Sequence, residues 1–341
     1  MTPYKKDLLQ VYCEDLPWEK LARANILVTG ATGLIGGCLV DLLMLNPKMD
    51  YHVYASSRNE DKAKHRFVGY LNNPFFHYVK YDVMTPLRSD VCFDYIIHAA
   101  SNATPSFYAS QPVEVMKANI FGVSFLLEYG ISHCMKRFLY ISSGEVYGEG
   151  DGRAFSEDYM GYVNCATVRA CYPSSKRAAE TLCISYASEC SIDVVIARPC
   201  HVYGPYFAEQ DNRVYAQFIR NILSGNNIIM KSKGEQYRSW CYVVDCASAL
   251  LHIILKGESG EAYNIADPES NVSIKNLAEI VAKIGRKKVV IDEPNTDEKL
   301  GYNIVRKSTF SIEKLKRLGW KPMTHIDMGL EKTINTILSN A

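Results

Sequence analysis

The feature that most constrains the fold is a glycine-rich loop, "VTGATGLIGG", which joins a short apolar run to a helical pattern. Gly30, Gly33 and Gly36 follow a G-x-x-G-x-x-G spacing, which allows a tight turn, a close approach of the backbone to a pyrophosphate, and close helix–strand packing. The first turn of the helix would direct N–H groups toward the phosphates. The loop therefore predicts a dinucleotide site. The cofactor contacts expected from it are Gly30, Thr32, Gly33, Leu34, Ile35 and Gly36.

Short apolar runs alternate with amphipathic segments from Asn25 to about Asp193. The runs are "NILVTG", "YHVYASS", "FFHYVKYD", "FDYIIHAAS", "RFLYISS" and "IDVVIARP". Continuous hydrophobicity without polar alternation is typical of parallel strands that are buried on both faces. Helical patterns at residues 111–133 and 172–187 would cover such strands. Together these patterns predict an α/β fold with a doubly wound parallel sheet of the Rossmann type.

The pattern loosens after Pro199, where loop-like sequence separates shorter helices and strands. We therefore expect residues 20–198 to form the dinucleotide-binding Rossmann domain, with returning segments near 239–265. Residues 199–238 and 266–341 are expected to form a smaller C-terminal α/β domain that binds the substrate. The elements expected in these parts include a helix at 214–223, a strand and a helix within 239–255, and a helix at 273–284.

Composition restricts the partners of the chain. The formal net charge is +1 and no run of Lys or Arg occurs, so neither nucleic acid nor an anionic membrane is an expected partner. No apolar stretch reaches the roughly 20 residues of a membrane span, and the first residues lack the apolar region of a signal peptide, so we expect a cytoplasmic protein. The 11 cysteines are scattered without a C-x-x-C pair, which indicates reduced thiols and no metal site.

A tyrosine and a lysine, Tyr172 and Lys176, are four residues apart in a helical pattern and therefore share one face. A phenol with the usual pKa near 10 is not a base at neutral pH. A lysine cation about 6 Å away would favour the phenolate by roughly 3 kcal/mol, and an oxidised nicotinamide would add a second positive charge. The pair thus predicts a general base whose pKa is lowered toward neutrality, with Lys176 also holding the nicotinamide ribose. Ser143 is the expected partner of the substrate hydroxyl.

Glu145 follows Ser143 in "SSGEVYG", and in an extended stretch the two side chains would point to the same side. Glu145 is therefore a candidate to act on the same substrate as Ser143. The alternative is a loop carboxylate that accepts backbone N–H groups. Asn119, in "KANIFG", is expected to tie a helix to a strand beside the site.

The end of the second apolar run bears on the choice of cofactor. The acid that would hold a ribose 2′-hydroxyl is missing from "YASSRN", and Arg58 stands there instead. A guanidinium in this place favours a 2′-phosphate and therefore NADP, unless Arg58 stacks beside the adenine or faces solvent. Asp82, in "KYDV", would contact the adenine amine or cap the next turn.

With these elements in order, the chain resembles the extended short-chain dehydrogenase/reductase family that modifies nucleotide sugars. The resemblance runs from Asn25 to Trp320 and rests on the glycine loop, "HAAS", "SSGEVYG", "YPSSK", "RPCHVYGP", "GEQYRSW" and "KLKRLGW". It implies NAD as a retained cofactor and a homodimer formed through the helix of Tyr172. The implied catalytic residues are Ser143, Glu145, Tyr172 and Lys176. The implied cofactor contacts outside the glycine loop are Arg58, Asp82, Val83, Ala99, Ala100, Ser101, Asn119, Tyr172, Lys176 and Arg198.

The same resemblance implies a nucleotide-diphosphate sugar as the substrate. The implied substrate contacts are Ser143, Gly144, Glu145, His201, Arg213 and Arg238. Arg238 would grip the phosphates, because its planar fork matches them; the alternative is a surface ion pair. His201 stands where the family has an asparagine that contacts the nucleotide sugar.

The implied chemistry begins with oxidation of the sugar C4 hydroxyl, which leads to decarboxylation, 4,6-dehydration or epimerisation. Gly144 stands where many related dehydratases carry a second acid, which disfavours that form of dehydration. "RACYPSSKRAAETLCISY" and "DNRVYAQFI" are similar to segments of the UDP-glucuronate decarboxylases. We therefore expect decarboxylation of UDP-glucuronate, with a 4,6-dehydratase or 4-epimerase as the alternative. A protein of another class, a catalytically idle dinucleotide sensor, would usually lack Tyr172 or Lys176.

Overall fold

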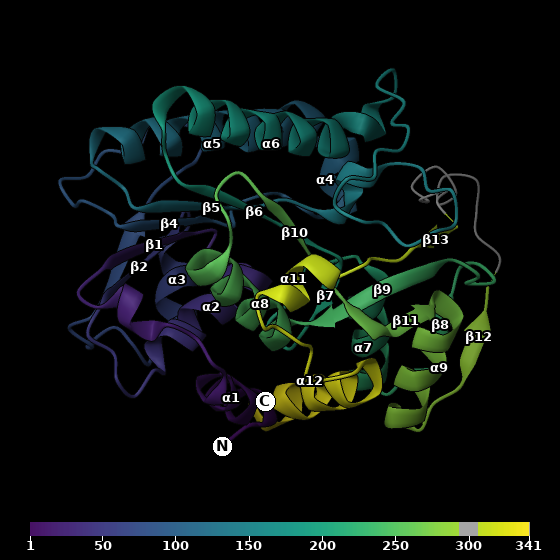
Figure 1. Ribbon diagram of the computed structural model, residues 1–341. Coiled ribbons are helices and arrows are strands. Elements are labelled where there is room, and N and C mark those ends of the chain that lie inside the picture. Colours follow the sequence, from purple (N-terminus) through teal and green to yellow (C-terminus); the bar gives the residue numbers. More distant parts are fainter. Residues whose placement is uncertain (293–305, 341) are drawn as a thin grey trace.

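The computed structural model describes residues 1–292 and 306–340. Its centre is a seven-stranded parallel sheet in the order β10-β6-β5-β4-β1-β2-β3 (Figure 1). From β1 the chain builds outward through β2 and β3, then crosses to β4 and continues through β5 and β6 in the other direction. This arrangement confirms the predicted doubly wound fold. The strands are β1 (Asn25–Thr29), β2 (His52–Ser57), β3 (Phe76–Lys80), β4 (Tyr95–His98), β5 (Arg137–Ile141), β6 (Val194–Pro199) and β10 (Ala262–Ile265).

Helices cover both faces of this sheet (Figure 1). On one face α5 (Pro112–Ser132) and α6 (Cys171–Cys190) lie side by side, and Val123 and Cys183 from them join a core with Leu27 of β1. On the other face α2 (Leu34–Met44), α3 (Glu60–Arg66) and α8 (Val243–Lys256) pack, and Leu39 and Leu250 belong to the larger core. The strands are buried from both sides, which explains their continuous hydrophobicity.

The C-terminal lobe is built around a second sheet. In it β9 (Tyr237–Tyr242) pairs with β7 (His201–Tyr203), β11 (Asp267–Ser273) and β13 (Lys307–Ser308). Because β9 belongs to this sheet, the segment that returns to the Rossmann domain begins with α8 at Val243, and the predicted start near residue 239 is corrected. The remaining elements of the lobe are β8 (Ile228–Met230), β12 (Val289–Ile291), α7 (Val214–Leu223), α9 (Ile274–Gly285), α11 (Glu313–Arg317) and α12 (Ile326–Asn340).

A helix that the sequence analysis missed, α1 (Pro3–Gln10), brings the two ends of the described chain together (Figure 1). Lys332 of α12 lies 2.8 Å from Asp7, and the Tyr4 hydroxyl donates to Asp41 of α2 at 2.7 Å. No helix among the described residues is long and apolar enough to cross a membrane. The short elements are α4 (Pro105–Ser110), η1 (Val11–Cys13), η2 (Trp18–Leu21), η3 (Gly144–Tyr147) and η4 (Val168–Ala170).

Candidate active site

The glycine loop connects β1 to α2 and packs against the residues that follow β4. Gly30 has a φ of 64°, in the left-handed region that favours glycine. A Cβ on Gly30 would lie 2.7 Å from Cα of Ala100, and a Cβ on Gly36 would lie 2.5 Å from the carbonyl oxygen of Gly30. Since neither position accepts a side chain, the backbone at the start of α2 can be approached closely by a pyrophosphate. The residues present therefore fit a dinucleotide, and the predicted Leu34 and Ile35 form the first turn of α2.

Asn119 ties three elements together beside this loop. Its Nδ2 donates to Ser175 Oγ of α6 at 2.9 Å, and its Oδ1 accepts from Ser101 Oγ, after β4, at 2.8 Å. Asn119 itself lies on α5 and is buried. The predicted role in tying a helix to a neighbouring strand end agrees with these contacts.

Arg58 and Asp82 lie where the adenosine end of a cofactor is expected. Asp82 Oδ1 accepts from the N–H of Met84 at 3.0 Å, so it caps the turn after β3, which is one of its two predicted roles. Arg58 Nη1 lies 3.2 Å from Glu114 Oε1. A carboxylate so near would repel a 2′-phosphate, so the structure weakens the argument for NADP that Arg58 alone suggests.

The predicted catalytic residues lie together where β5 and α6 meet. Lys176 is 1% exposed, and its Nζ donates to the carbonyl of Ile141 at 2.9 Å. The same Nζ lies 5.8 Å from the centre of the Tyr172 ring, close to the separation assumed from the sequence. Ser143, two residues after β5, lies close enough to Tyr172 to lower the pKa of its phenol. The fold thus assembles a hydroxyl, a phenol and an amine at the carboxyl edge of the sheet.

The electrostatics of this group differ from the prediction. Burial raises the pKa of Tyr172 to about 12 and the charge of Glu145 adds to the shift, while Ser143 and Arg213 act against it. Burial also lowers the pKa of Lys176 to about 7. Lys176 is therefore only partly protonated at neutral pH. The protein groups alone do not lower the pKa of Tyr172 as the sequence predicted. The sequence showed the spacing of the pair but not its burial.

A buried amine of this kind lowers the stability of the fold. Because the pKa of Lys176 falls from 10.5 to about 7 on folding, the unfolded chain binds more protons between these values, and stability rises with pH across that window. Lys176→Met removes this penalty but leaves the Ile141 carbonyl without its donor. We expect a net gain of about 2 kcal/mol at pH 6.5, or roughly 4 °C in Tm, that falls to zero near pH ~8.5 and becomes a loss at higher pH. Thermal unfolding followed by circular dichroism measures it.

The matched control is Lys117→Met, which removes an exposed lysine from α5. Its Tm difference from the wild-type protein should stay the same at pH 6.5 and 9.5. If Lys176→Met shows an equally constant difference, or a loss that grows at low pH, the amine is not destabilised by burial.

The segment that carries Glu145 is the 3-10 turn η3, so the predicted extended conformation is wrong there. Ser143 caps this turn, because its Oγ accepts from the N–H of Glu145 at 3.2 Å. Glu145 Oε1 accepts from Arg169 Nη2 at 2.7 Å. The partner of the carboxylate is therefore a guanidinium, not the backbone N–H groups of the alternative interpretation.

Two residues that the sequence analysis did not select complete this part of the site. The Tyr108 ring from α4 stacks on Tyr172, with centroids 4.6 Å apart and an interplanar angle of 21°. Arg169 lies with its Cζ 4.7 Å from the centre of the Tyr108 ring, so it joins Tyr108 to Glu145. Arg169 falls inside the "RACYPSSK" segment that was similar to the decarboxylases, so this similarity could have identified it as a site residue. Tyr108 is distant in the sequence and only the fold brings it to α6.

The C-terminal lobe contributes His201 and Arg213. His201 lies opposite Trp240 in the pairing of β7 with β9, and their ring centroids are 5.2 Å apart. Burial, together with the charges of Arg238 and Arg213, lowers the pKa of His201 to about 3, so the imidazole is neutral. Arg213 Nε lies 2.9 Å from Oδ1 of Asp211, a buried partner that the sequence analysis also missed. Asp211 holds the guanidinium in one orientation.

Arg238, the predicted phosphate ligand, is 4% exposed. Its Nη1 donates to the carbonyl oxygens of Tyr237 at 2.9 Å and Arg306 at 3.2 Å. Burial lowers the pKa of Arg238 to about 10, and the charge of Glu145 opposes this shift. Arg238 therefore does not lie on the surface, as the alternative required. A buried and partly desolvated guanidinium suits an anionic ligand.

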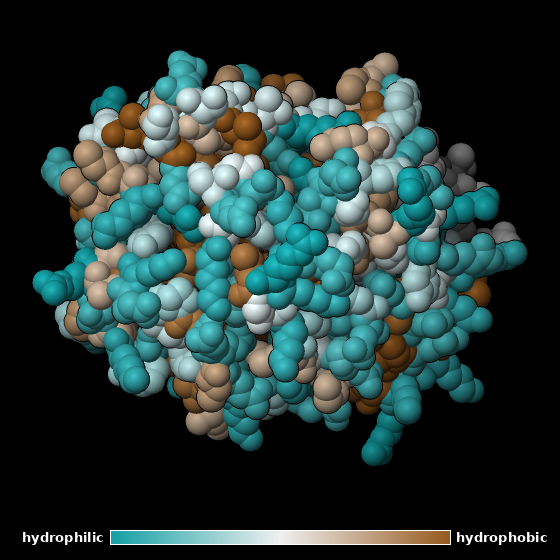
Figure 2. Space-filling model, in the orientation of Figure 1, coloured by the Kyte–Doolittle hydropathy of each residue, from teal (hydrophilic) through white to brown (hydrophobic). Residues whose placement is uncertain are grey.

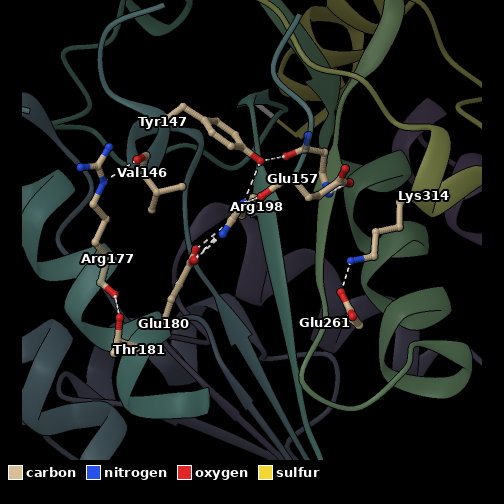
Figure 3. Close-up of polar contacts among 10 residues, drawn as sticks. Val146, Tyr147, Glu157, Arg177, Glu180, Thr181, Arg198, Glu261 and Lys314 are labelled. Atoms are coloured by element: carbon tan, nitrogen blue, oxygen red, sulfur yellow. Dashed lines mark hydrogen bonds and ion pairs between the residues drawn. The ribbon is translucent and has the colours of Figure 1, made fainter. Parts of the chain in front are cut away.

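Arg198, a predicted cofactor contact, is bound inside the protein instead (Figure 3). Its Nε and Nη2 donate to Glu180 at 3.0 and 2.7 Å, and its Nη1 donates to the Tyr147 hydroxyl at 3.1 Å and the Glu157 carbonyl at 2.6 Å. Because each guanidinium nitrogen already has a protein acceptor, we correct this expectation: Arg198 ties β6 to α6 and to η3. Arg198 and Glu180 also line a cavity of about 910 Å³, and Tyr172 is not among its lining residues.

All eleven cysteines are free. In the described ranges, 1–292 and 306–340, no group of three or more His, Cys, Asp or Glu side chains is arranged to hold a metal ion. The chemistry that the site offers is therefore that of a phenol, an amine, a carboxylate and guanidinium groups beside a dinucleotide loop.

This combination of fold and site defines a class of nucleotide-binding enzyme, and comparison with known proteins identifies it. The model of the NAD dependent epimerase/dehydratase family matches residues 26–266, and the chain belongs to this family. It is 35% identical over 311 residues to UDP-glucuronic acid decarboxylase 6 of Arabidopsis thaliana, covering 90% of this chain and 86% of the relative. It is 32% identical to UDP-glucuronic acid decarboxylase 1 of Xenopus tropicalis, covering 92% of this chain and 72% of the relative.

Solved structures give the same result for the fold. The UDP-glucose 4-epimerase of Thermotoga maritima, crystallised with UDP-glucose, superposes with a TM-score of 0.79 at 25% identity, covering 93% of this chain and 99% of that one. The UDP-glucuronic acid 4-epimerase of Bacillus cereus, in complex with UDP-glucuronic acid and NAD, has a TM-score of 0.79 at 23% identity, covering 93% and 100%. The predicted family and its NAD dependence are thus confirmed.

Proposed function

We propose that this protein removes the C5 carboxylate of UDP-glucuronate as CO2 after transient oxidation of the sugar at C4. The observation that carries the proposal is that Ser143, Glu145 and Arg213 all lie near enough to Tyr172 to shift its pKa, and that Glu145 also acts on the buried Arg238. Two guanidiniums suit a sugar nucleotide that carries a diphosphate and a carboxylate. The 35% identity to a UDP-glucuronic acid decarboxylase over most of the chain supports this choice among the possible sugars.

NAD would be held by the glycine loop, by Asn119 with its neighbours, and by Lys176. When bound, NAD supplies an acceptor for the C4 hydride and later its donor, and its positive ring favours ionisation of the buried phenol. The protein supplies the proton transfers. Tyr172 takes the proton of the C4 hydroxyl while Ser143 orients that hydroxyl, and Tyr172 returns the proton at the end.

The middle of the reaction needs no base at C5. The C5–C6 bond breaks, its electron pair moves toward the C4 carbonyl, and CO2 departs. Arg213 would orient the carboxylate before it leaves. Glu145, which lies near enough to Tyr172 to raise its pKa, would guide the proton that C5 then accepts.

The masses of the products test the proposal. The purified protein is offered UDP-glucuronate, dTDP-glucose and GDP-mannose in separate reactions, and mass spectrometry follows each. We expect loss of CO2 from UDP-glucuronate alone. Loss of water from a neutral hexose with UDP-glucuronate untouched would make the protein a dehydratase, and conversion without a change in mass would make it an epimerase. Bound NAD without any turnover would favour a dinucleotide sensor.

We also propose a homodimer that acts in the cytoplasm. Apolar side chains are exposed on α5 and α6, among them Met116, Phe121 and Ile184, and Figure 2 shows apolar groups over these helices at the top of the view. Eleven free thiols suit a reducing compartment. Light scattering coupled to gel filtration would contradict the dimer by returning the mass of one chain.

A further inference from the structure

Gly144 lies between Ser143 and Glu145 in the 3-10 turn and has no room for a side chain. A Cβ built on Gly144 lies 2.1 Å from Cζ and 2.6 Å from Cε1 of Phe310. A separation below 3.0 Å cannot persist, so any other residue at 144 requires the ring to move. Gly144 does not have the positive φ that favours glycine, so the neighbouring ring and not the backbone conformation explains this glycine.

Phe310 is held too firmly to move aside at low cost. It is 3% exposed and packs edge-on against the rings of Tyr147, at 5.6 Å, and Phe155, at 5.8 Å. Its N–H donates to Ser239 Oγ at 3.1 Å, and the adjacent carbonyl of Thr309 accepts from the N–H of Phe155 at 2.7 Å. The C-terminal lobe thus presses an anchored aromatic ring against the turn that bears the carboxylate.

We propose that Phe310 is a specificity-determining residue, because its ring occupies the place of a second acidic side chain next to Ser143. This inference rests on the proposed function and deepens it: the pair of Gly144 and Phe310 leaves Glu145 as the carboxylate that this turn offers. It directs the C4 ketone toward loss of a carboxylate and away from loss of a hydroxyl.

The chemistry of the two outcomes explains why the missing acid matters. Loss of water from a C4 ketone removes the C5 proton to a base and breaks the C6–O bond, and the departing oxygen must take a proton from an acid. Loss of CO2 breaks the C5–C6 bond, the electron pair passes to the C4 carbonyl, and the leaving molecule needs no proton. A turn with one carboxylate and an apolar ring therefore serves the second reaction.

A double-mutant cycle tests the pair. Wild type, Gly144→Asp, Phe310→Ala and Gly144→Asp/Phe310→Ala are compared by Tm, and by product masses from UDP-glucuronate and UDP-glucose. We expect Gly144→Asp to lose at least 6 °C, the double variant to regain half of that loss or more although Phe310→Ala is itself destabilising, and only the double variant to release water from UDP-glucose. Gly144→Asp/Phe155→Ala is the matched control, because Phe155 packs on Phe310 while the Phe310 ring supplies the three atoms nearest to a Cβ at 144, and it should regain nothing.

Two results would overturn the inference. Additive losses in Tm would show that the ring does not occupy the place of a side chain at 144. If the double variant recovers stability but forms no new product, the contact between Gly144 and Phe310 has only a structural role. If Gly144→Asp does not fold, Gly144→Ala with Phe310→Leu gives the same cycle in Tm. The Tm cycle uses no sugar, so inactivity of the wild-type protein toward UDP-glucuronate would refute the proposed function without touching this result.

Discussion

Replacing Tyr172 with phenylalanine is expected to lower the turnover of UDP-glucuronate about 1,000-fold, or roughly 4 kcal/mol of transition-state stabilisation, while NAD remains bound. The phenol is the group placed to take the C4 proton: it is buried, and Ser143 and Arg213 both favour its ionised form. Phenylalanine keeps the ring that stacks on Tyr108, so the fold of the site should survive. Product release and NAD content are measured on the same preparation.

Tyr186→Phe is the matched control for this result. Tyr186 lies on the same helix, and its hydroxyl contacts Ser124 and Glu128 away from the site. It should keep turnover within a factor of two. If Tyr172→Phe also stays within a factor of three of the wild-type protein, the phenol is not the base, and the proposed chemistry fails at its first step.

Much of the fold is predictable because its signals are local or periodic. The six apolar runs became β1 to β6, and the helical pattern at residues 214–223 became α7 with the same bounds. The glycine loop is also a local signal, because a side chain at Gly30 or Gly36 would clash with neighbouring backbone atoms. Helix α1 was missed although Thr2 caps it and Pro3 begins it, which is a local signal; only its distant contacts, such as the Lys332–Asp7 pair, depend on the fold.

The sequence indicated which side chains lie together in the site better than it indicated their charge states. Spacing brought Tyr172 and Lys176 to one face, but only the tertiary structure shows that burial removes much of the lysine charge. The family resemblance assigned Arg198 to the cofactor, whereas its charge is satisfied by Glu180, from another element of the fold. Burial and long-range pairing are properties of the packed chain, and a pattern of residue types does not contain them.

Glu145→Gln separates the first step of the reaction from the next. We expect product release to fall about 100-fold while C4 oxidation continues, so reduced cofactor accumulates and its near-ultraviolet absorbance stays high. The amide keeps an oxygen for Arg169, which preserves the turn. The charge of Glu145 raises the pKa of Tyr172, so its removal lowers that pKa and should move the pH profile of C4 oxidation to lower pH.

Glu149→Gln is the control for this variant, because it removes an exposed carboxylate just beyond the same turn. It should leave both steps and the pH profile unchanged. Normal turnover of Glu145→Gln would mean that Glu145 has only a structural role. Loss of C4 oxidation would mean that Glu145 acts in the step that forms the ketone. If Glu145 lies beside Tyr172 and acts on the ketone, its variant should shift the pH profile of C4 oxidation and also block product release. A merely structural loss would slow both steps without moving the pH dependence.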